Sequence, residues 1–379
     1  MQAKKYVSHI SHPWLNLFLI TSFSLSLLGI LFVFESSLIE SLKTFGNQYF
    51  ILKQHLVGLA LGVVGFLSLA KLPPKWWLKL APAAYIFNLI LLVLTFFPGI
   101  GLKLNGAHRW ISLGPVSFQP VEALKLSLVL ILSYQLPRFS SEKKRLINFL
   151  FYLSLPALII LLQPDLGSLL LIGFVAVVVY FLAGGSGKSL SLLTLATIPL
   201  VLMVIVLAPY RLKRLTTFIN PDQDPLGASF HIRQLHLALG RGGWFGVGVG
   251  NSTQKYAYVP EAATDSIFAI VGEEVGFVGS SFIILLYLLF FISGFKLIDQ
   301  SQAQIKEKLV GFGFLAIILS QTFFNLGAVV GLIPLTGMPL PFFSYGRSSQ
   351  IMIWLALAYL VSLHLHASKK TTKFKSHKR

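Results

Sequence analysis

The chain has 379 residues, of which 55% are hydrophobic and only 12% are charged. Soluble domains carry about 25% charged residues, so the composition excludes an ordinary soluble fold and is typical of an integral membrane protein. Cysteine is absent, which excludes disulfides, thiolate nucleophiles and cysteine-ligated metals.

Ten apolar runs are each long enough for a transmembrane helix, which needs about 20 residues. The runs cover residues 14–34, 50–70, 79–98, 119–137, 147–163, 167–183, 189–208, 266–295, 308–333 and 350–366. The sequence therefore predicts an all-α polytopic membrane protein with ten transmembrane helices, forming one membrane domain over residues 1–379. No small-residue cleavage site follows the first run, so we expect it to be retained rather than removed as a signal peptide.

The basic residues are distributed unevenly between the two ends of these runs. The termini and even-numbered connections hold 19 Lys and Arg residues, whereas the odd-numbered connections hold 12, half of them in one long loop where the charge rule is weak. This asymmetry predicts that segment 1–13 and the basic tail 367–379 are cytoplasmic, and the tail is suited to contact anionic lipid. The net charge of +18 is therefore mostly an orientation signal, and nucleic-acid binding is not needed to explain it.

One long connection, residues 209–264, lies between the seventh and eighth runs and is predicted to be extracytoplasmic. Within it, "ASFHIRQLHLALG" places several apolar side chains near one another and predicts a short helix. That helix either lies in the membrane interface or packs as an ordinary loop helix.

Four polar clusters are predicted to meet on the outer face. They comprise Arg109, Glu122 and Lys125 in "NGAHRWISLGPVSFQPVEALK", Asp165 in "QPDLG", Glu261 and Asp265 in "YVPEAATDS", and the irregular segment "TGMPLPFFSYGRSS" at 336–349. Irregular backbone at membrane depth is tolerated only where protein buries it or where it lines a wet cavity. We therefore expect an outward-facing polar cavity roofed by the long loop.

Structural alternatives exist for the first two clusters. Glu122 and Lys125 are three residues apart on one helix face, so they either neutralise each other or contact a ligand. Asp165 either satisfies backbone N–H groups at a helix start or faces the cavity.

The acidic residues around the eighth run also leave alternatives open. Asp265 is well placed to cap the eighth helix, which would lower its pKa, whereas a dry cavity with Glu261 nearby would raise it. Glu273 and Glu274 lie eight and nine residues further along. On one continuous helix they would face the bundle interior, and we expect them to be structural, hydrogen-bonded to neighbouring helix ends.

Five motifs in this order resemble the SEDS family of bacterial cell-wall polymerases (FtsW, RodA and SpoVE): "NGAHRWISLG", "FQPVEALKL", "QPDLGS", "GRGGWFGVGVGNSTQKYAYVPEAATDSIFAIVGEEVGFVG" and "PLPFFSYGRSS". The resemblance runs from about residue 14 to 366, and "GNSTQKYAYVPEA" is most similar to the cell-division branch, FtsW. It implies a peptidoglycan glycosyltransferase in the bacterial cytoplasmic membrane that polymerises lipid II, an undecaprenyl-pyrophosphate-linked disaccharide-pentapeptide, during septal cell-wall synthesis. It also implies a class B penicillin-binding protein transpeptidase and other divisome proteins as partners, and no nucleic acid.

The resemblance also implies roles for individual residues. Asp265 falls on the family's essential aspartate, Glu122, Lys125 and Asp165 on its polar cavity, and Arg109 on the arginine of its first outer loop. Two further positions depart from the family pattern. Ala263 stands where histidine is common, and Arg347 stands where a glycine usually follows "SYG".

For lipid II polymerisation we expect Asp265 to act as a general base on a sugar hydroxyl, with inversion at the donor carbon and no covalent intermediate. The expected substrate-binding residues are Arg109, Glu122, Lys125, Asp165, Arg233, Lys255 and Glu261. Further cations suited to the pyrophosphate are Arg211, Arg214 and Arg241. A divalent cation, Mg²⁺ or Mn²⁺, held by Asp165 or Asp265 would assist, and no organic cofactor is expected.

Two other functions fit the same pattern. A lipid II flippase would use a similar cavity with binding near the midplane, but the polar clusters gather on one face only. A non-catalytic division scaffold would need no acidic residue at position 265.

Overall fold

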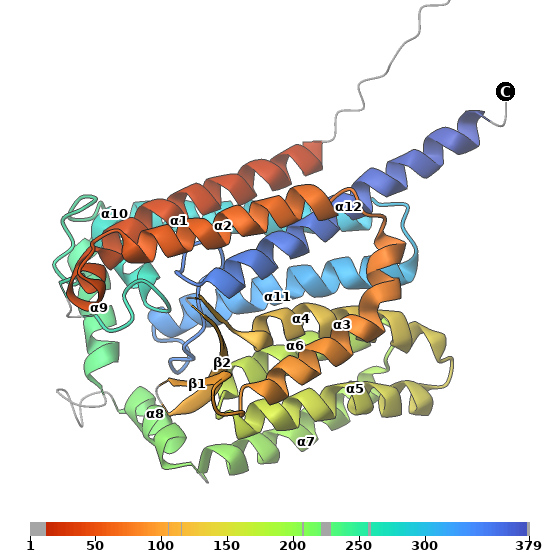
Figure 1. Cartoon of the computed structure of the whole chain (residues 1–379), viewed down its shortest axis with the longest axis horizontal. Helices are drawn as coiled ribbons and strands as arrows, with labels where there is room; N and C mark the ends of the chain where they lie inside the picture. The colour runs from red at the N-terminus through yellow and green to blue at the C-terminus, as the bar shows by residue number, and fades with distance from the viewer. Residues whose placement is uncertain are drawn as a thin grey trace, which may run out of the picture.

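A computed structural model describes residues 13–376, apart from residues 105, 115, 207, 221–228 and 257–258. In this part of the chain, long helices pack side by side into one bundle (Figure 1). The start of α1 and the end of α12 lie at one end of the bundle, whereas α8, α9 and the strands lie toward the other (Figure 1). The predicted N-terminal segment falls almost wholly on residues 1–12, outside the described part.

Eight helices are long and apolar enough to cross a membrane. They are α1 (Pro13–Phe45), α2 (Phe50–Leu69), α3 (Pro74–Leu94), α5 (Glu142–Leu162), α7 (Gly187–Val206), α10 (Ile267–Asp299), α11 (Ile305–Val329) and α12 (Arg347–Ser376). Two shorter helices, α4 (Pro120–Gln135) and the apolar α6 (Leu166–Leu182), coincide with the fourth and sixth predicted runs. The helical membrane-protein fold is confirmed, whereas the number of ten crossings depends on these two short helices.

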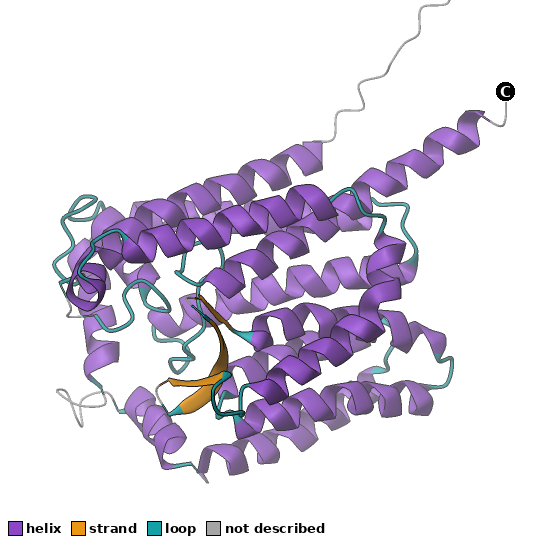
Figure 2. Ribbon diagram, viewed as in Figure 1, coloured by secondary structure: helices purple, strands orange, loops and turns teal. Residues whose placement is uncertain are grey.

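A small antiparallel sheet connects α3 to α4 and was not predicted from the sequence. It consists of β1 (Gly101–Leu104), β2 (Ala107–Leu113) and β3 (Val116–Phe118), in that order (Figure 2). Gly106 and Gly114 have φ values of 79° and 70° in the two turns, a conformation that glycine adopts without strain. The sheet places Arg109 of β2 beside Asp165, the N-cap residue of α6.

The long connection between α7 and α10 contains two helices, α8 (Pro209–Ile219) and α9 (Phe230–Gly242). The helix predicted in "ASFHIRQLHLALG" is therefore confirmed as α9. Its Leu235 and Ala238 are buried, and a Cβ on Gly242 would lie only 2.0 Å from the Gly272 carbonyl of α10. Helix α9 is thus packed tightly against α10, and its predicted position in the membrane interface stays a prediction.

Helix α10 is broken, so the expectation of one continuous helix is wrong. Gly276 has φ 67° and ψ −167°, which no helical residue adopts. The neighbouring loop satisfies the backbone groups exposed by the break. Its amides at 247 and 248 donate to the carbonyls of Glu273 and Glu274, and its carbonyls at 243 and 244 accept from the amides at 277 and 278. Because nothing apolar can hydrogen-bond these groups, the loop and the break depend on each other.

The irregular segment 330–346 between α11 and α12 is buried in its second half, around residues 340–344, whereas Val330 and Leu332 at its start are exposed. Phe342 and Phe343 are fully buried, and the Tyr287 hydroxyl of α10 donates to the Pro341 carbonyl. A Cβ on Gly29 of α1 would lie 2.1 Å from the Phe342 carbonyl, so this segment runs directly against α1. The protein therefore buries this irregular backbone, as expected at membrane depth.

Replacing Gly276 by alanine tests the break. A Cβ there would lie 2.3 Å from the Gly246 nitrogen at a positive φ, so we expect Gly276→Ala to destabilise the protein by about 2 kcal/mol or more. Gly173→Ala in α6 is the matched control, because its Cβ would meet no atom within 4 Å. Thermal unfolding of the two purified variants in detergent checks this. Equal melting temperatures would contradict it.

Candidate active site

Asp265 lies just before α10, in a turn formed by residues 261–266. The helix N-cap is Ser266, so the expectation that Asp265 caps this helix is wrong. The amides of Thr264 and Ser266 both donate to the Glu261 carbonyl, at 3.0 and 3.2 Å. Glu261 itself has a φ of 52°, an uncommon value for a residue with a side chain. The chain therefore turns sharply immediately before Asp265.

Residues from two distant segments hold this turn by its backbone. The Asn325 side-chain amide of α11 donates to the carbonyls of Asp265 and Met338, both at 2.8 Å. The Tyr345 amide donates to the Ala263 carbonyl at 2.8 Å, and the Ser344 hydroxyl donates to the Thr264 carbonyl. The turn is thus attached along segment 338–345, with the Asp265 carboxylate left available.

The Asp265 carboxylate is half-buried and electrostatically unusual. Burial, followed by the nearby Glu261 carboxylate, raises its pKa from 3.8 to about 7. Arg214 of α8 opposes this rise, and its guanidinium also donates to the Leu335 carbonyl. Of the two effects left open by the sequence, desolvation therefore outweighs stabilisation of the charged form.

Asp165 caps α6 and pairs with Arg109. Its carboxylate accepts from the amide and the hydroxyl of Ser168, at 3.2 and 2.8 Å. The Arg109 Nε of β2 lies 3.8 Å from the Asp165 carboxylate, and the same guanidinium donates to the Pro164 carbonyl. Asp165 therefore caps α6, as one of the two alternatives predicted, and it also forms an ion pair with Arg109 of the sheet.

Asp165 and Asp265 flank the same stretch of segment 330–346. A Cβ on Gly167, two residues after Asp165, would lie 2.8 Å from the Thr336 carbonyl. A Cβ on Gly337 would lie 3.8 Å from the Asp265 carboxylate. Residues 336–338 therefore separate the two acidic residues, which share one end of the bundle.

Glu122 and Lys125 form a buried ion pair. Their charged atoms are 2.7 Å apart, and Lys125 also donates to the Gln321 side chain of α11 at 3.3 Å. The two side chains are each only 6% exposed and border a cavity of about 10 Å³, enough for roughly one water. Gln321 lies one helical turn before Asn325, so the pair lies close beneath the Asp265 turn. The geometry matches mutual neutralisation.

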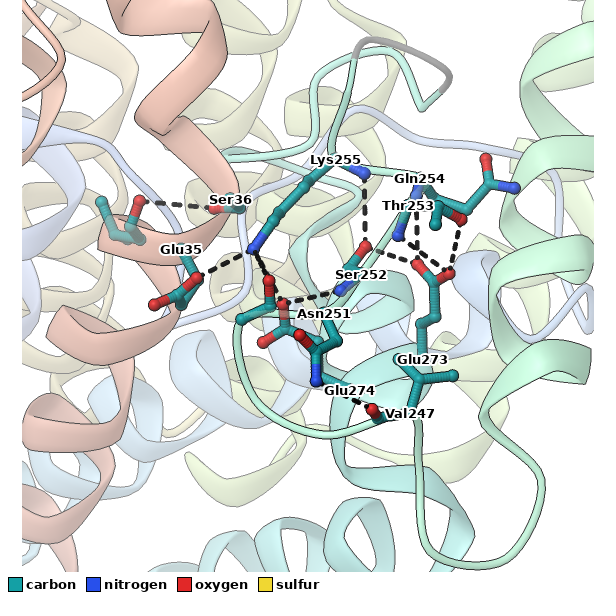
Figure 3. A network of polar contacts seen from close by, with 12 residues as sticks. Glu35, Ser36, Val247, Asn251, Ser252, Thr253, Gln254, Lys255, Glu273 and Glu274 are labelled. Atoms are coloured by element: carbon teal, nitrogen blue, oxygen red, sulfur yellow. Dashed lines mark hydrogen bonds and ion pairs between the residues drawn. The ribbon is translucent and has the colours of Figure 1, made fainter.

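Lys255 is enclosed by protein rather than presented at the Asp265 turn. Its ammonium binds the Glu35 carboxylate of α1 at 2.9 Å, the Gly250 carbonyl at 2.7 Å and the Glu274 carboxylate at 3.4 Å (Figure 3). Burial lowers the pKa of Lys255, but pairing with Glu35 and Glu274 raises it by more than burial lowers it. The net shift of the Lys255 pKa is therefore upward. These contacts attach loop 250–255 to α1 and α10.

Glu273 completes this polar network. Its carboxylate accepts from the Ser252 hydroxyl and from the amides at 253 and 254 (Figure 3), and Arg241 of α9 lies 3.6 Å away. The expectation that Glu273 and Glu274 are structural is supported, but their partners lie in loop 250–255 rather than at helix ends. Arg241 is likewise committed to this network.

The other predicted residues lie at the surface of the same region. Arg233 is exposed on α9 and makes no ion pair among the described residues. Glu261 is exposed and accepts from the Thr264 hydroxyl at 2.9 Å. Arg211 donates to the Val204 carbonyl at 3.0 Å. Of these three residues, Glu261 is the one whose charge raises the pKa of Asp265.

The two departures from the family pattern have distinct surroundings. Arg347 begins α12 and donates to Gln54 of α2 at 2.6 Å and to Ser117 of β3 at 3.4 Å, so it ties the sheet to the bundle. Ala263 is 2% exposed and contributes its carbonyl to the turn.

Sequence reasoning missed two residues of this site, Asn325 and His231. Asn325 lies within an apolar run, where one amide gave no signal of function. His231 lies in the first turn of α9, and its Nε2 is 2.8 Å from the Ser266 hydroxyl oxygen. The sequence shows a histidine at the start of the predicted loop helix, but it does not show that its partner is Ser266, 35 positions away.

The described residues contain no group of three or more His, Asp or Glu side chains arranged to hold a metal ion. A cation bound by one carboxylate and substrate phosphates would not need such a group. The Mg²⁺ or Mn²⁺ expected at Asp165 or Asp265 therefore stays a prediction, and the chemistry below does not depend on it.

Comparison with known proteins identifies the family. Residues 15–369 match the family model for FtsW, RodA and SpoVE, described as cell cycle proteins. The chain belongs to this family. It is 35% identical over 359 residues to stage V sporulation protein E of Bacillus subtilis, covering 93% of this chain and 96% of that protein. It is 34% identical over 370 residues to the probable peptidoglycan glycosyltransferase FtsW of Coxiella burnetii, covering 96% and 98%.

Solved structures share the fold. A chain from a study of how a peptidoglycan synthase complex coordinates polymerization and crosslinking aligns with a TM-score of 0.73 and 27% identity, over 92% of this chain and 97% of that chain. The rod shape determining protein RodA of Thermus thermophilus aligns with a TM-score of 0.68 and 26% identity, over 92% and 95%. The bundle is therefore a RodA-like membrane fold.

The buried pair of Glu122 and Lys125 predicts an asymmetric response to mutation. Lys125→Met leaves Glu122 buried without a partner and should cost about 3–5 kcal/mol. The double variant Glu122→Gln with Lys125→Met should recover most of that loss. Melting temperatures and lipid II binding of the wild type and the two variants separate a structural role of the pair from a substrate-binding role. A stable double variant that no longer binds lipid II would show that the pair also contacts substrate.

The raised pKa of Asp265 predicts a stability effect that depends on pH. A carboxyl whose pKa is higher in the folded than in the unfolded state favours folding below the unfolded value, and that stability is lost as pH rises through about 7. Asp265→Asn should therefore raise the melting temperature at pH 8 and change it little near pH 4. Equal shifts at both pH values would contradict the raised pKa.

Proposed function

We propose that this protein is a peptidoglycan glycosyltransferase that polymerises lipid II, with Asp265 as its general base. The observation that carries the proposal is the half-buried Asp265 carboxylate with a pKa of about 7, held by its backbone at one end of a RodA-like bundle. A general base works best when its pKa is near the working pH. The relatives named as probable FtsW glycosyltransferases support the same reaction.

The reaction joins the 4-hydroxyl of one lipid-linked sugar to the anomeric carbon of another. As the new C–O bond forms, Asp265 takes the hydroxyl proton and the bond to the lipid pyrophosphate breaks. Direct displacement inverts the anomeric centre, so the α-linked donor gives a β-linked product. General-base catalysis of this kind contributes about 10²–10⁴ in rate.

The pyrophosphate leaving group needs positive charge rather than a proton. Arg214 acts on the Asp265 carboxylate, Arg233 is exposed on α9, and Arg109 lies at the outer sheet. Guanidinium groups bind phosphate oxygens in pairs and stay charged at any physiological pH. We therefore assign the pyrophosphate to these three arginines, whereas Lys255 and Arg241 are occupied within the structure. Mg²⁺ or Mn²⁺ near Asp165 or Asp265 would supply additional positive charge.

The proposed topology has ten crossings, with both termini in the cytoplasm and residues 209–264 outside. It is supported by the position of the α1 start and the α12 end at one end of the bundle, away from α8 and α9. The excess of Lys and Arg on the terminal side supports the same orientation. Asp265 would then meet the lipid II head group at the outer interface of the bacterial cytoplasmic membrane. The basic tail 367–379 continues α12 to Ser376, and residues 377–379 lie outside the described part.

A crosslinking partner fits this function. The similar chain from the peptidoglycan synthase study belongs to a complex that both polymerises and crosslinks. We propose that this protein works with a class B penicillin-binding protein transpeptidase, and with other divisome proteins at the division septum. The FtsW relatives favour division over elongation.

Asp265→Asn tests the base directly. In liposomes with labelled lipid II and the partner transpeptidase, the variant should lose about 10²–10⁴ of glycan-chain formation while still binding lipid II. Wild-type activity should rise with pH through about 7, because the base must be ionised. Lipid II translocation without any polymerisation by the wild type would favour a flippase. An Asp265→Asn protein that supports normal growth would favour a scaffold.

A further inference from the structure

His231 contacts both ends of the turn that carries Asp265. Its Nε2 lies 2.8 Å from the Ser266 hydroxyl oxygen, on the helix side of Asp265. Its ring is also hydrogen-bonded to the backbone of Pro260, immediately before Glu261. Because proline has no N–H, the partner there is the Pro260 carbonyl and the ring is the donor. One imidazole on α9 therefore spans residues 260 and 266.

In a neutral ring, these two contacts fix the tautomer. A neutral histidine donates from one nitrogen and accepts at the other. Since the ring donates to the Pro260 carbonyl, its Nε2 accepts from the Ser266 hydroxyl. Burial, followed by the positive charge of Arg214 on α8, lowers the pKa of His231 to about 4, which keeps the ring neutral at physiological pH.

The turn between these contacts needs an external hold. Glu261 sits at a φ of 52°, and the Glu261 carbonyl accepts from two amides, so the chain is bent back on itself. Asn325, Ser344 and Tyr345 attach one side of the turn to α11 and segment 338–345. His231 attaches the other side to α9, which is itself packed on α10. Without His231 the turn would be held from one side.

We propose that His231 is a positioning residue: a neutral imidazole that holds both ends of the Glu261–Asp265 turn and so fixes the Asp265 carboxylate against its substrate. No hydrogen bond or ion pair joins the His231 ring to the Asp265 carboxylate in the described residues, so His231 acts through the turn and not on the reacting atoms. The inference rests on the proposed role of Asp265 as general base.

The expected effect is on turnover rather than on substrate affinity. Displacing a catalytic group by about 1 Å costs on the order of 10²-fold in rate. His231→Phe keeps a ring of similar size but removes both hydrogen bonds, so kcat for lipid II polymerisation should fall about 10- to 100-fold. KM should change less than about twofold, because the arginines assigned to the pyrophosphate are untouched.

The pH profile gives a readout that a loss of stability would not produce. A loosened turn exposes Asp265 to water and weakens the two influences that raise its pKa, burial and Glu261, while Arg214 continues to oppose them. The acid limb of kcat against pH should therefore move to lower pH in His231→Phe. His231→Asn or His231→Gln, whose side-chain amides each keep a donor and an acceptor but cannot place both as the ring does, should recover part of both the rate and the profile.

Full-length protein in liposomes, with its partner and labelled lipid II, is the material for this test. His236→Phe is the matched control, since His236 is exposed on the same helix, and it should retain wild-type kinetics. Ser266→Ala removes the other half of one contact and serves if His231→Phe does not fold. Its kcat should fall, and the double variant His231→Phe with Ser266→Ala should lose less than the product of the two single losses.

Wild-type kcat and an unmoved acid limb in both His231→Phe and Ser266→Ala would overturn the inference. A loss expressed only in KM would also overturn it and would make His231 a substrate contact. Asp265→Asn is assayed in parallel. If that variant is inactive while the His231 variants are normal, the positioning role fails and the proposed function stands. If Asp265→Asn is active, the proposed function itself fails.

Discussion

Backbone groups inside an apolar bundle must find their hydrogen-bond partners within the protein, and this constraint shapes the whole site. Helix α10 breaks at Gly276, and loop 243–248 supplies the donors and acceptors that the break exposes. The loop can do so only because glycines such as Gly246 let two backbones approach, since a Cβ there would lie 2.1 Å from the Glu274 carbonyl. The break in turn allows Glu273 and Glu274 to reach loop 250–255.

The charged residues divide into two groups by their surroundings. Glu122 pairs with Lys125, Glu274 with Lys255 and Glu273 with Arg241, in each case within the protein. The three carboxylates, Lys125 and Lys255 are buried, whereas Arg241 is half exposed. Buried pairs contribute little net stability, but removing one partner is costly. Asp265 makes no such ion pair among the described residues: burial and the Glu261 charge raise its pKa, and the opposing charge of Arg214 does not reverse that rise. Structural carboxylates here are neutralised, and the candidate base is not.

The helices could be predicted because a crossing needs a long apolar run, and each of the ten runs coincides with a helix. Local patterns failed where partners are distant. The apolar run around Gly276 looked continuous, since nothing local indicates a break that a loop 30 residues earlier repairs. The ion pair of Lys255 could not be predicted, because its partner Glu35 is 220 positions away. The direction of the pKa shift at Asp265 depends on burial, which no sequence pattern reports. The Asn-Gly pair at positions 105–106 is a local sequence signal for a hairpin that the sequence analysis did not use.

The Asp265 turn reconciles an unstable charge with a fixed position. A raised pKa means that the ionised carboxylate is less stable in the folded protein than in water. Hydrogen bonds to its oxygens would hold it in place, but they would also lower its pKa and make it a weaker base. The structure avoids this conflict by holding the neighbouring backbone. Asn325 binds the Asp265 carbonyl, Tyr345 the Ala263 carbonyl and Ser344 the Thr264 carbonyl. The carboxylate itself accepts from its own backbone amide and, at 3.4 Å, from the Thr264 hydroxyl, and these two bonds lower its pKa less than burial and Glu261 raise it. Position is thus set through the main chain, and basicity is preserved at the side chain.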